Sequence, residues 1–469
     1  AARAQDIKGR RARCPMAMKR NKVSPTRCLS VAVAILAVLI GLSWPFDGLN
    51  KERYGITDPT FVGGWNGAPF GRGPNLRVLM ALLMQYVPLE SVQKFGCAVL
   101  TPWPSDPDMQ LYNGLYLRGI DLAAAALRRF PESYDTQRTC IATAAFSSLF
   151  NPYTSSAAGR AGHVELALKA FRRWKADPEF QQLGQLGCFF DLSPANARRF
   201  AEADGVRFVH DVIKTHFNNT EVQFQAFCAY SSGCGHGNAE LCGDEEGLIE
   251  TMVRVMQLHR KVRVREEVMQ VVRQMANASR LRPRLVEAGI VPQLVQVLQE
   301  RKDSKTDQSV ACEAMGELLS GYAPGGYEPD LKALSSMNAT TRSQRQAVFA
   351  REGALEQIVA AVDLAAGLTL PAGFGGQNEQ ALAQYNVERS CFRAVAVLAL
   401  GNPENQGTLV RLGAPAKIAK AMRARAADKD VQGAGCEALQ VLSEDNAANK
   451  QAVDAAEPPS CASFALRAS

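Results

Sequence analysis

Four side chains of the types that bind zinc lie close together in the middle of the 469-residue sequence: Cys228, Cys234, His236 and Cys242. Their spacing lacks the close pair of cysteines that structural zinc sites use, so they are a weak candidate metal site. A disulfide such as Cys234–Cys242 is a second interpretation, which an oxidising compartment would favour. Free thiols are the third interpretation, and the one that we expect.

The rest of the sequence offers no catalytic centre. The histidines are scattered and form no His-Glu-x-x-His motif. The glycine-rich segments at 63–73 and 373–376 lack the Lys-Ser/Thr pair that a phosphate-binding loop requires. His210 falls in a column of apolar residues, where we prefer a hydrogen-bonded core histidine to a catalytic one. We therefore expect a protein that is not an enzyme, with no catalytic residue, metal or cofactor.

Two further sets of residues have both a chemical and a structural interpretation. Three Asn-x-Ser/Thr sequons would matter in a secretory compartment: Asn218, Asn277 and Asn338. Asn277 falls where a helix should end, so we prefer the structural interpretation for these asparagines. Three cysteines share one place in a repeated pattern, and we expect them to be small packing residues: Cys97, Cys312 and Cys436.

The net charge of +7 is concentrated at one end of the chain. Residues 1–27 hold nine Lys/Arg and one Asp, which makes a basic leader of +8 and leaves −1 for the remainder. A near-neutral body without interleaved aromatic residues disfavours nucleic acid as a partner. The hydrophobic fraction of 47% excludes a mostly disordered chain.

Residues 28–45 follow the leader as an apolar run, and 28–44 contain no charged residue. A helix of this length is about 25 Å long, at the short end of what crosses a membrane. The preceding Lys/Arg excess predicts a single-pass transmembrane helix whose amino terminus lies on the positive-inside face. A cleaved targeting segment and a buried core helix are the alternatives. We expect an organellar membrane, of a plastid or a mitochondrion, and leave the side open.

Residues 46–72 are rich in Gly, Pro and Asn, so we expect an extended linker rather than a helix. The aromatic residues Phe61, Trp65 and Phe70 are apolar anchors in this segment. They pin the linker to the body, or they form a strap that lies across a partner. Both interpretations stay open.

From residue 73 onward the sequence repeats with a period of about 42 residues. Each copy has a glycine that should open an amphipathic helix: Gly119, Gly162, Gly205, Gly247, Gly289, Gly353 and Gly413, with a weaker copy at Gly73. The residues five and nine positions after these glycines are mostly apolar and share one helical face. A second helix is marked three times by Gln-x-x-[Gly/Ala]-Cys, and a short third helix leads to the next glycine.

This pattern resembles the armadillo repeat family. Segments 285–298 (LVEAGIVPQLVQVL), 308–319 (QSVACEAMGELL) and 431–442 (VQGAGCEALQVL) carry the similarity. It implies an all-α fold, a right-handed α-solenoid of about seven to eight armadillo-like repeats over residues 73–455, with a tail at 456–469. The importin-alpha branch of the family clamps peptides with a ladder of asparagines. The matching positions here include Glu317, Val397 and Val441, so we do not expect that mode of binding.

Two copies carry insertions, at 322–341 and 364–386, that are punctuated by Gly and Pro as loops are. Long insertions in a regular array often bind partners, and functionless loops are the alternative. Tyr322, Tyr327 and Phe374 are the candidate contacts in them. A local basic cluster supplies four more candidates, which nearby acidic residues could neutralise: Arg260, Lys261, Arg263 and Arg265.

These features together lead us to expect a non-enzymatic interaction protein. It would be a membrane-tethered scaffold or accessory subunit that stabilises a larger complex, of respiratory or photosynthetic type. Its partners would be other proteins, with the membrane contacted through residues 28–45. The alternative is a soluble armadillo adaptor that binds peptides or client proteins after its N-terminal targeting segment is removed.

Overall fold

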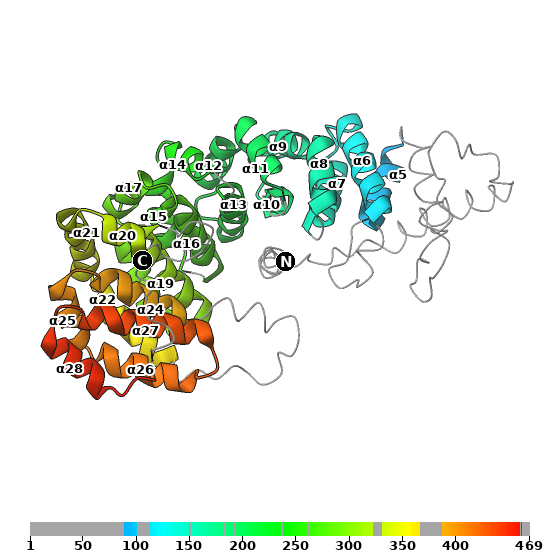
Figure 1. Cartoon of the computed structure of the whole chain (residues 1–469). Coiled ribbons are helices and arrows are strands. Elements are labelled where there is room, and N and C mark those ends of the chain that lie inside the picture. The colour runs from blue at the N-terminus through cyan, green and yellow to red at the C-terminus, as the bar shows by residue number, and fades with distance from the viewer. Residues whose placement is uncertain are drawn as a thin grey trace.

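A computed structural model describes residues 89–100, 113–149, 152–181, 184–190, 193–235, 238–260, 262–321, 331–365, 387–459 and 461. All regular elements within these residues are helices, which follow one another along an arch (Figure 1). None of the helices described is long and apolar enough to cross a membrane. The basic leader, the expected membrane helix at 28–45 and the linker at 46–72 lie outside the described residues.

The helices form three series that alternate along the chain. The first helices are α8 (Pro152–Arg160), α11 (Pro194–Glu202), α14 (Ala239–Asp244), α17 (Leu281–Glu287), α21 (Ala339–Arg351), α25 (Pro403–Arg411) and α28 (Ala447–Ala455). The second helices are α9 (His163–Arg173), α12 (Gly205–Thr215), α15 (Leu248–Leu258), α18 (Ile290–Glu300), α22 (Ala354–Ala365) and α26 (Ala414–Ala424). The third helices are α5 (Glu90–Leu100), α7 (Tyr134–Leu149), α10 (Gly184–Phe190), α13 (Thr220–Gly233), α16 (Val262–Ala276), α19 (Lys305–Ser320), α24 (Val387–Ala399) and α27 (Lys429–Ser443).

The turn between a first and a second helix has a left-handed backbone conformation. The φ angle is 81° at Gly162 and 91° at Gly289, in a region that residues with a Cβ rarely adopt. In one repeat Asp204 takes this conformation instead, and the following Gly205 packs so closely that a Cβ would overlap the ring of Phe200. The glycine turn predicted from the sequence is therefore confirmed in these repeats.

The first described repeat departs from this pattern. We expect Gly119 to open a helix, but it lies inside α6 (Asn113–Arg129), in which the first and second helices continue without a turn. A glycine inside a helix costs about 1 kcal/mol relative to alanine. The buried face that includes Ile120, Ala123 and Leu127 offsets this cost by packing into the core.

The apolar columns predicted from the sequence form one core along the arch. The residues five positions after the glycines are buried in six successive repeats: Ala167, His210, Met252, Leu294, Ile358 and Ile418. Neighbouring repeats pack on one another, so that the same cluster includes Cys97 near one end and Val453 near the other. This continuity is expected of a solenoid, because a single repeat cannot bury its apolar face alone.

A glutamine near the start of the third helix holds the end of the second helix. The side-chain amide of Gln308 donates to the carbonyl oxygens of Leu298 (2.9 Å) and Arg301 (3.0 Å). Carbonyls at a helix end have no partner within their own helix. The same pair of bonds is made by Gln137, Gln181, Gln223 and Gln432. The glutamine of the Gln-x-x-[Gly/Ala]-Cys motif is therefore a capping residue of the fold.

The insertion at 322–341 is helical in its second half, so our interpretation of it as one loop is wrong. The short helix α20 (Leu331–Ser336) forms there because Leu334 is buried and the helix packs on α19. Asn338 then caps α21 by accepting hydrogen bonds from two backbone N–H groups. The first two residues of the second insertion, 364 and 365, end α22 rather than start a loop.

Eight of the described cysteines form four disulfides: Cys97–Cys140, Cys234–Cys242, Cys312–Cys391 and Cys436–Cys461. The first and third of these join consecutive third helices, α5 to α7 and α19 to α24. The fourth ties the C-terminal tail to α27. The prediction that Cys97, Cys312 and Cys436 are only packing residues is therefore wrong. Stacking of third helices brings the facing Cα atoms of Cys97 and Cys140 to 5.0 Å, within the range that disulfides require.

Candidate interaction surface

The third helices form the inner face of the arch. Figure 1 shows α7, α10, α13, α16 and α19 along its inner side and the first helices α11, α14 and α17 along its outer side. Consecutive third helices pack directly on one another. We define the inner strip as eight polar residues of α16, α19, α24 and α27 that remain at least partly exposed: Arg263, Glu266, Gln274, Glu313, Arg389, Arg393, Glu437 and Gln440.

A buried arginine connects two inner helices in the middle of the arch. Arg273 of α16 donates from Nε to Oε2 of Glu317 (2.8 Å) and from Nη2 to Oε1 (2.7 Å), so the pair is bidentate. Its Nη1 also contacts Oε2 of Glu313 on α19 at 2.7 Å. Glu317 is fully buried, and the side chain of Glu313 is 12% exposed. One cation thus holds two carboxylates, one inside the fold and one in the inner strip.

Similar polar contacts continue along the inner face in both directions. The Ser231 hydroxyl donates to Oε2 of Glu267 (2.9 Å), which joins α13 to α16. The Ser390 hydroxyl donates to Oε1 of Glu313 (2.8 Å), which joins α24 to α19. Arg389 of α24 lies 3.5 Å from Oδ2 of Asp430 at the start of α27. Side chains of opposite or complementary kind therefore connect each inner helix from α13 to α27 to the next.

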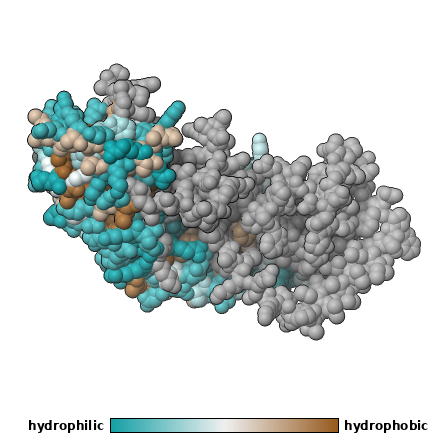
Figure 2. Space-filling model, turned by 90° about the horizontal axis from the view of Figure 1, so that it is seen from below, coloured by the Kyte–Doolittle hydropathy of each residue, from teal (hydrophilic) through white to brown (hydrophobic). Residues whose placement is uncertain are grey.

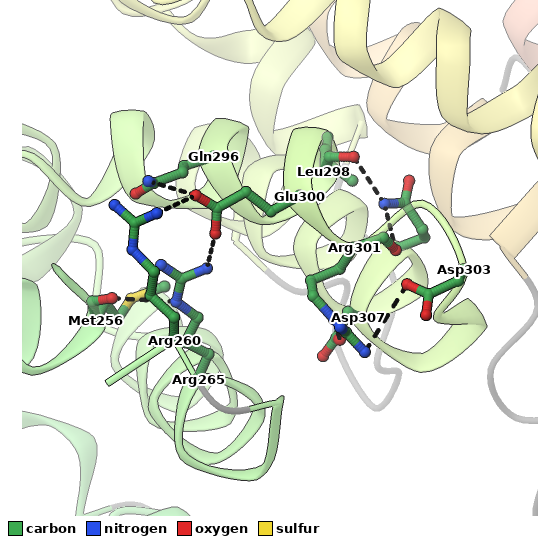
Figure 3. Close-up of polar contacts among 10 residues, drawn as sticks. Met256, Arg260, Arg265, Gln296, Leu298, Glu300, Arg301, Asp303 and Asp307 are labelled. Atoms are coloured by element: carbon green, nitrogen blue, oxygen red, sulfur yellow. Dashed lines mark hydrogen bonds and ion pairs between the residues drawn. The ribbon is translucent and has the colours of Figure 1, made fainter. Parts of the chain in front are cut away.

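The described residues of the basic cluster predicted as a contact site have different environments in the structure. Arg265 is buried, where its Nε donates to the carbonyl of Met256 (3.0 Å) and its Nη1 to Oε2 of Glu300 (2.8 Å) (Figure 3). It takes the place that the capping glutamine has in other repeats, so its assignment as a partner contact is wrong. Arg260 is exposed and bonds the same carboxylate at 3.0 Å. Lys261 lies outside the described residues.

The carboxylate between these arginines is held in its charged form. Burial alone would raise the pKa of Glu300, but the hydrogen bonds and charge of Arg265 outweigh it, and the pKa lies below its usual value. Gln296 donates a further hydrogen bond to the same carboxylate. The single carboxylate of Glu300 therefore neutralises part of the positive charge of this cluster within the protein.

The next carboxylate in this region behaves in the opposite way. Asp307 of α19 is buried, and this burial raises its pKa although Ser304 and Arg301 act to lower it. Arg301 donates from Nε to Oδ2 of Asp307 (3.2 Å), and the backbone N–H of Asp307 donates to the Ser304 hydroxyl oxygen (3.2 Å). Arg301 also lies 3.8 Å from the exposed Asp303 (Figure 3). The contacts of Arg301 are thus structural and link the end of α18 to the start of α19.

Arg263 is, like Arg260, an exposed member of the basic cluster. Its guanidinium carbon lies 4.1 Å from the centroid of the Phe224 ring on the neighbouring inner helix. A cation over an aromatic face gains about 0.5–1 kcal/mol at an exposed site. The stacking fixes the side chain at the surface of the inner strip, where it can meet a partner without prior ordering.

At the weak candidate zinc site the disulfide interpretation is confirmed, and the expectation of free thiols is wrong for Cys234 and Cys242. Cys234 and Cys242 are bonded to each other, so neither supplies a thiolate to a metal. Cys228 is buried and lies outside that bond. His236 lies outside the described residues, among which no group of three or more metal-binding side chains is found.

Two buried histidines are core residues of the fold. His210 bonds Glu245 through Nδ1 (3.0 Å) and Thr251 through Nε2 (3.1 Å), as expected for a satisfied core histidine. His163 is fully buried, and its Nε2 donates to the carbonyl of Ile120 at 2.7 Å. Desolvation lowers the pKa of His163 to about 4, so the ring is neutral at physiological pH.

The other predicted contacts lie outside the described residues: Phe61, Trp65 and Phe70 of the linker, and Tyr322, Tyr327 and Phe374 of the insertions. Their roles stay predictions. The inner strip is the surface that sequence reasoning missed, apart from Arg263. Part of its signal is present in the sequence, because Glu313, Arg393 and Glu437 are charged residues at equivalent places of α19, α24 and α27.

The described helices repeat one three-helix unit along the chain. A first helix, a left-handed turn, a second helix and a third helix recur along the chain. A crystal structure of an engineered protein is similar over 81% of this chain and 82% of its own, with a TM-score of 0.62 at 17% identity. The described chain is an armadillo-like α-solenoid. A designed armadillo repeat protein, solved in complex with the peptide (KR)4, matches 60% of this chain and 94% of its own, with a TM-score of 0.42 at 17% identity.

Comparison of the sequence gives no closer assignment. No protein-family model matches it, and no curated protein does. In this solenoid three of the positions that match the peptide-clamping asparagines are buried: Glu317, which pairs with Arg273, Val397 and Val441. The inner face therefore lacks that family mechanism at these positions.

Apolar residues are scattered singly over the solenoid surface. Seen from below, the described surface at the C-terminal end is mainly hydrophilic, with isolated hydrophobic residues (Figure 2). The large exposed ones include Tyr153, Leu241 and Leu258, which lie on three different helices. Single exposed apolar residues are ordinary in folded proteins. The polar inner strip is thus the better candidate for recognition.

Proposed function

We propose that this protein is a non-enzymatic interaction scaffold that binds other proteins along the inner strip. The observation that carries the proposal is the unbroken stacking of consecutive third helices, four of which carry the partly exposed polar residues of the inner strip. Extended surfaces of stacked repeats are what solenoid proteins use for binding. The internal ion pairs keep these helices in fixed register, which lowers the entropy cost of association.

The proposal includes a tether and a larger assembly. Residues 28–45 would anchor the scaffold in the membrane of a plastid or a mitochondrion or, where the leader acts as a signal anchor, of the secretory pathway. The protein would be an accessory subunit of a complex there. The basic, acid-poor leader supports a plastid or a mitochondrion, and equally the start of a signal anchor. The aromatic strap and the two insertions would add contacts outside the inner strip.

Fractionation and co-purification of the full chain from its native membranes test this proposal. After carbonate extraction the chain should stay in the membrane pellet, and in mild detergent it should migrate with other proteins in an assembly larger than itself. Recovery as a soluble protein would contradict the tether. Migration as a single chain under all mild conditions would contradict the scaffold.

A soluble adaptor that has lost its leader is the second candidate. It is supported by the basic, acid-poor leader of residues 1–27, which resembles a targeting segment. Amino-terminal sequencing of the native protein separates the candidates. A start beyond residue 45 supports the adaptor, and retention of residues 28–45 supports the tethered scaffold.

A further inference from the structure

The described disulfides need an oxidising compartment. The sulfur pairs have sequence separations from 8, in Cys234–Cys242, to 79, in Cys312–Cys391, and seven of the eight cysteines are buried. Forming each disulfide removes two electrons and two protons from two thiols, and a thiol oxidoreductase of the compartment must accept the electrons. Cytosolic thiols are kept reduced. Because the bonds are buried, they must form before or during folding of the repeats.

The three sequons all lie at exposed turns of the solenoid. Asn218 lies in the turn between α12 and α13, Asn277 directly follows α16, and Asn338 precedes α21. All three side chains are exposed, although most of the neighbouring repeat is buried. A glycan at any of them would extend into solvent without displacing a packed residue.

The capping role of Asn338 is compatible with a glycan. Its Oδ1 accepts hydrogen bonds from the backbone N–H groups of Thr340 (3.0 Å) and Thr341 (3.3 Å). N-linked sugars are attached to Nδ2, so the oxygen would still cap the helix. The adjacent cap at α13 is provided by Asn219 and not by the sequon residue Asn218. Neither attachment would therefore remove a helix cap.

We propose that the repeats fold in the lumen of the secretory pathway and carry N-linked glycans on Asn218, Asn277 and Asn338. In this step Nδ2 of each asparagine displaces the diphosphate leaving group at C1 of a lipid-linked oligosaccharide. The N–C1 bond forms, the C1–O bond breaks, and an amide proton passes to a base of the transferase, with no change of oxidation state. The basic leader before an apolar run would keep the amino terminus in the cytoplasm and the repeats in the lumen.

Digestion of the full-length native protein with a peptide N-glycosidase in heavy-oxygen water tests the proposal. The enzyme converts each glycosylated asparagine to aspartate and labels it, and it should raise gel mobility. We expect labelled aspartate at all three positions. Non-reducing peptide mapping of the same sample should recover the four disulfide pairs.

Single variants make the assignment specific. N218Q, N277Q and N338Q should each remove one glycan, whereas N219Q removes the neighbouring helix cap but keeps the Asn218 sequon and should retain all three. An unmodified native chain would overturn the proposal, whether its cysteines are paired or reduced. This result would leave the scaffold proposal standing, because that proposal is tested by the assembly in which the chain migrates.

Discussion

Arg273 and Glu317 form a buried, bidentate ion pair between the inner helices α16 and α19, with N–O distances of 2.8 and 2.7 Å. The same guanidinium reaches Glu313 at the edge of the inner strip. A buried pair of this kind adds little net stability over an apolar replacement, but removal of one partner leaves the other charge uncompensated. The relationship therefore fixes the register of two repeats and positions a surface carboxylate.

Replacement of Arg273 by alanine should destabilise the middle of the solenoid. The variant leaves Glu317 buried without its cation, which costs about 3–5 kcal/mol. Hydrogen exchange of amides in α16 and α19 measures this loss locally, which suits a repeat protein that need not unfold in one step. The matched control is Arg199→Ala, which breaks an exposed pair with Glu165 and should cost about 0–1 kcal/mol. Equal effects of the two variants would contradict the role of Arg273.

Replacement of Gln308 by alanine tests the capping of second helices. The change leaves the carbonyl oxygens of Leu298 and Arg301 without their side-chain donor, and a buried unsatisfied group costs about 1–3 kcal/mol. Amides at the end of α18 should exchange faster in the variant. The control Gln299→Ala changes an exposed glutamine of α18 itself and should leave the exchange rates at the end of that helix unchanged. Similar rates in both variants would mean that the caps do not hold these helix ends.

His163 should make stability depend on pH in acid. Its pKa is about 4 in the folded protein and about 6.5 when unfolded, so between these values the unfolded state binds the extra proton. Stability is fully present above pH 6.5 and falls as the pH drops toward 4, by about 3 kcal/mol in total. Unfolding midpoints of the wild type and His163→Phe over this range measure the effect.

The His163→Phe variant should lose that part of the pH dependence. Asp307, whose pKa is raised by burial, contributes with the opposite sign, because its folded form retains a proton as the pH rises above its unfolded value. Asp307 is present in both the wild type and the variant, so its contribution cancels in the difference between their stabilities. An identical slope with and without His163 would show that this histidine is not buried in its neutral form.

The Cys312–Cys391 disulfide should stabilise the junction that contains the second insertion. It closes a segment with a sequence separation of 79, and loss of such a bond costs about 2–4 kcal/mol. The double variant Cys312→Ala, Cys391→Ala should therefore show faster exchange in α19 and α24, with α9 and α12 unaffected. A uniform effect on all helices, or none, would contradict a local role for this bond.

The sequence predicts the periodic part of the fold and misses the contacts between distant repeats. Glycine spacing and apolar columns depend on local helix geometry, so Gly289 and the column that includes Met252 are placed correctly. The pairing of Cys312 with Cys391 depends on how two third helices stack across an insertion. The burial of Arg265 likewise depends on a carboxylate, Glu300, that is 35 residues away. Such contacts depend on how the repeats stack in three dimensions, which the local sequence pattern does not specify.

Charge reversal on the two faces of the arch tests the scaffold account most directly. Arg263→Glu changes the inner strip on α16, and Arg198→Glu makes the same substitution at an exposed position of the outer helix α11. Both variants of the full chain should fold, as circular dichroism and thermal unfolding can verify. The account predicts that Arg263→Glu releases the protein from its native assembly in mild detergent, whereas Arg198→Glu leaves the assembly intact. Retention of the assembly by Arg263→Glu together with its loss in Arg198→Glu would place recognition on the outer face and contradict the account.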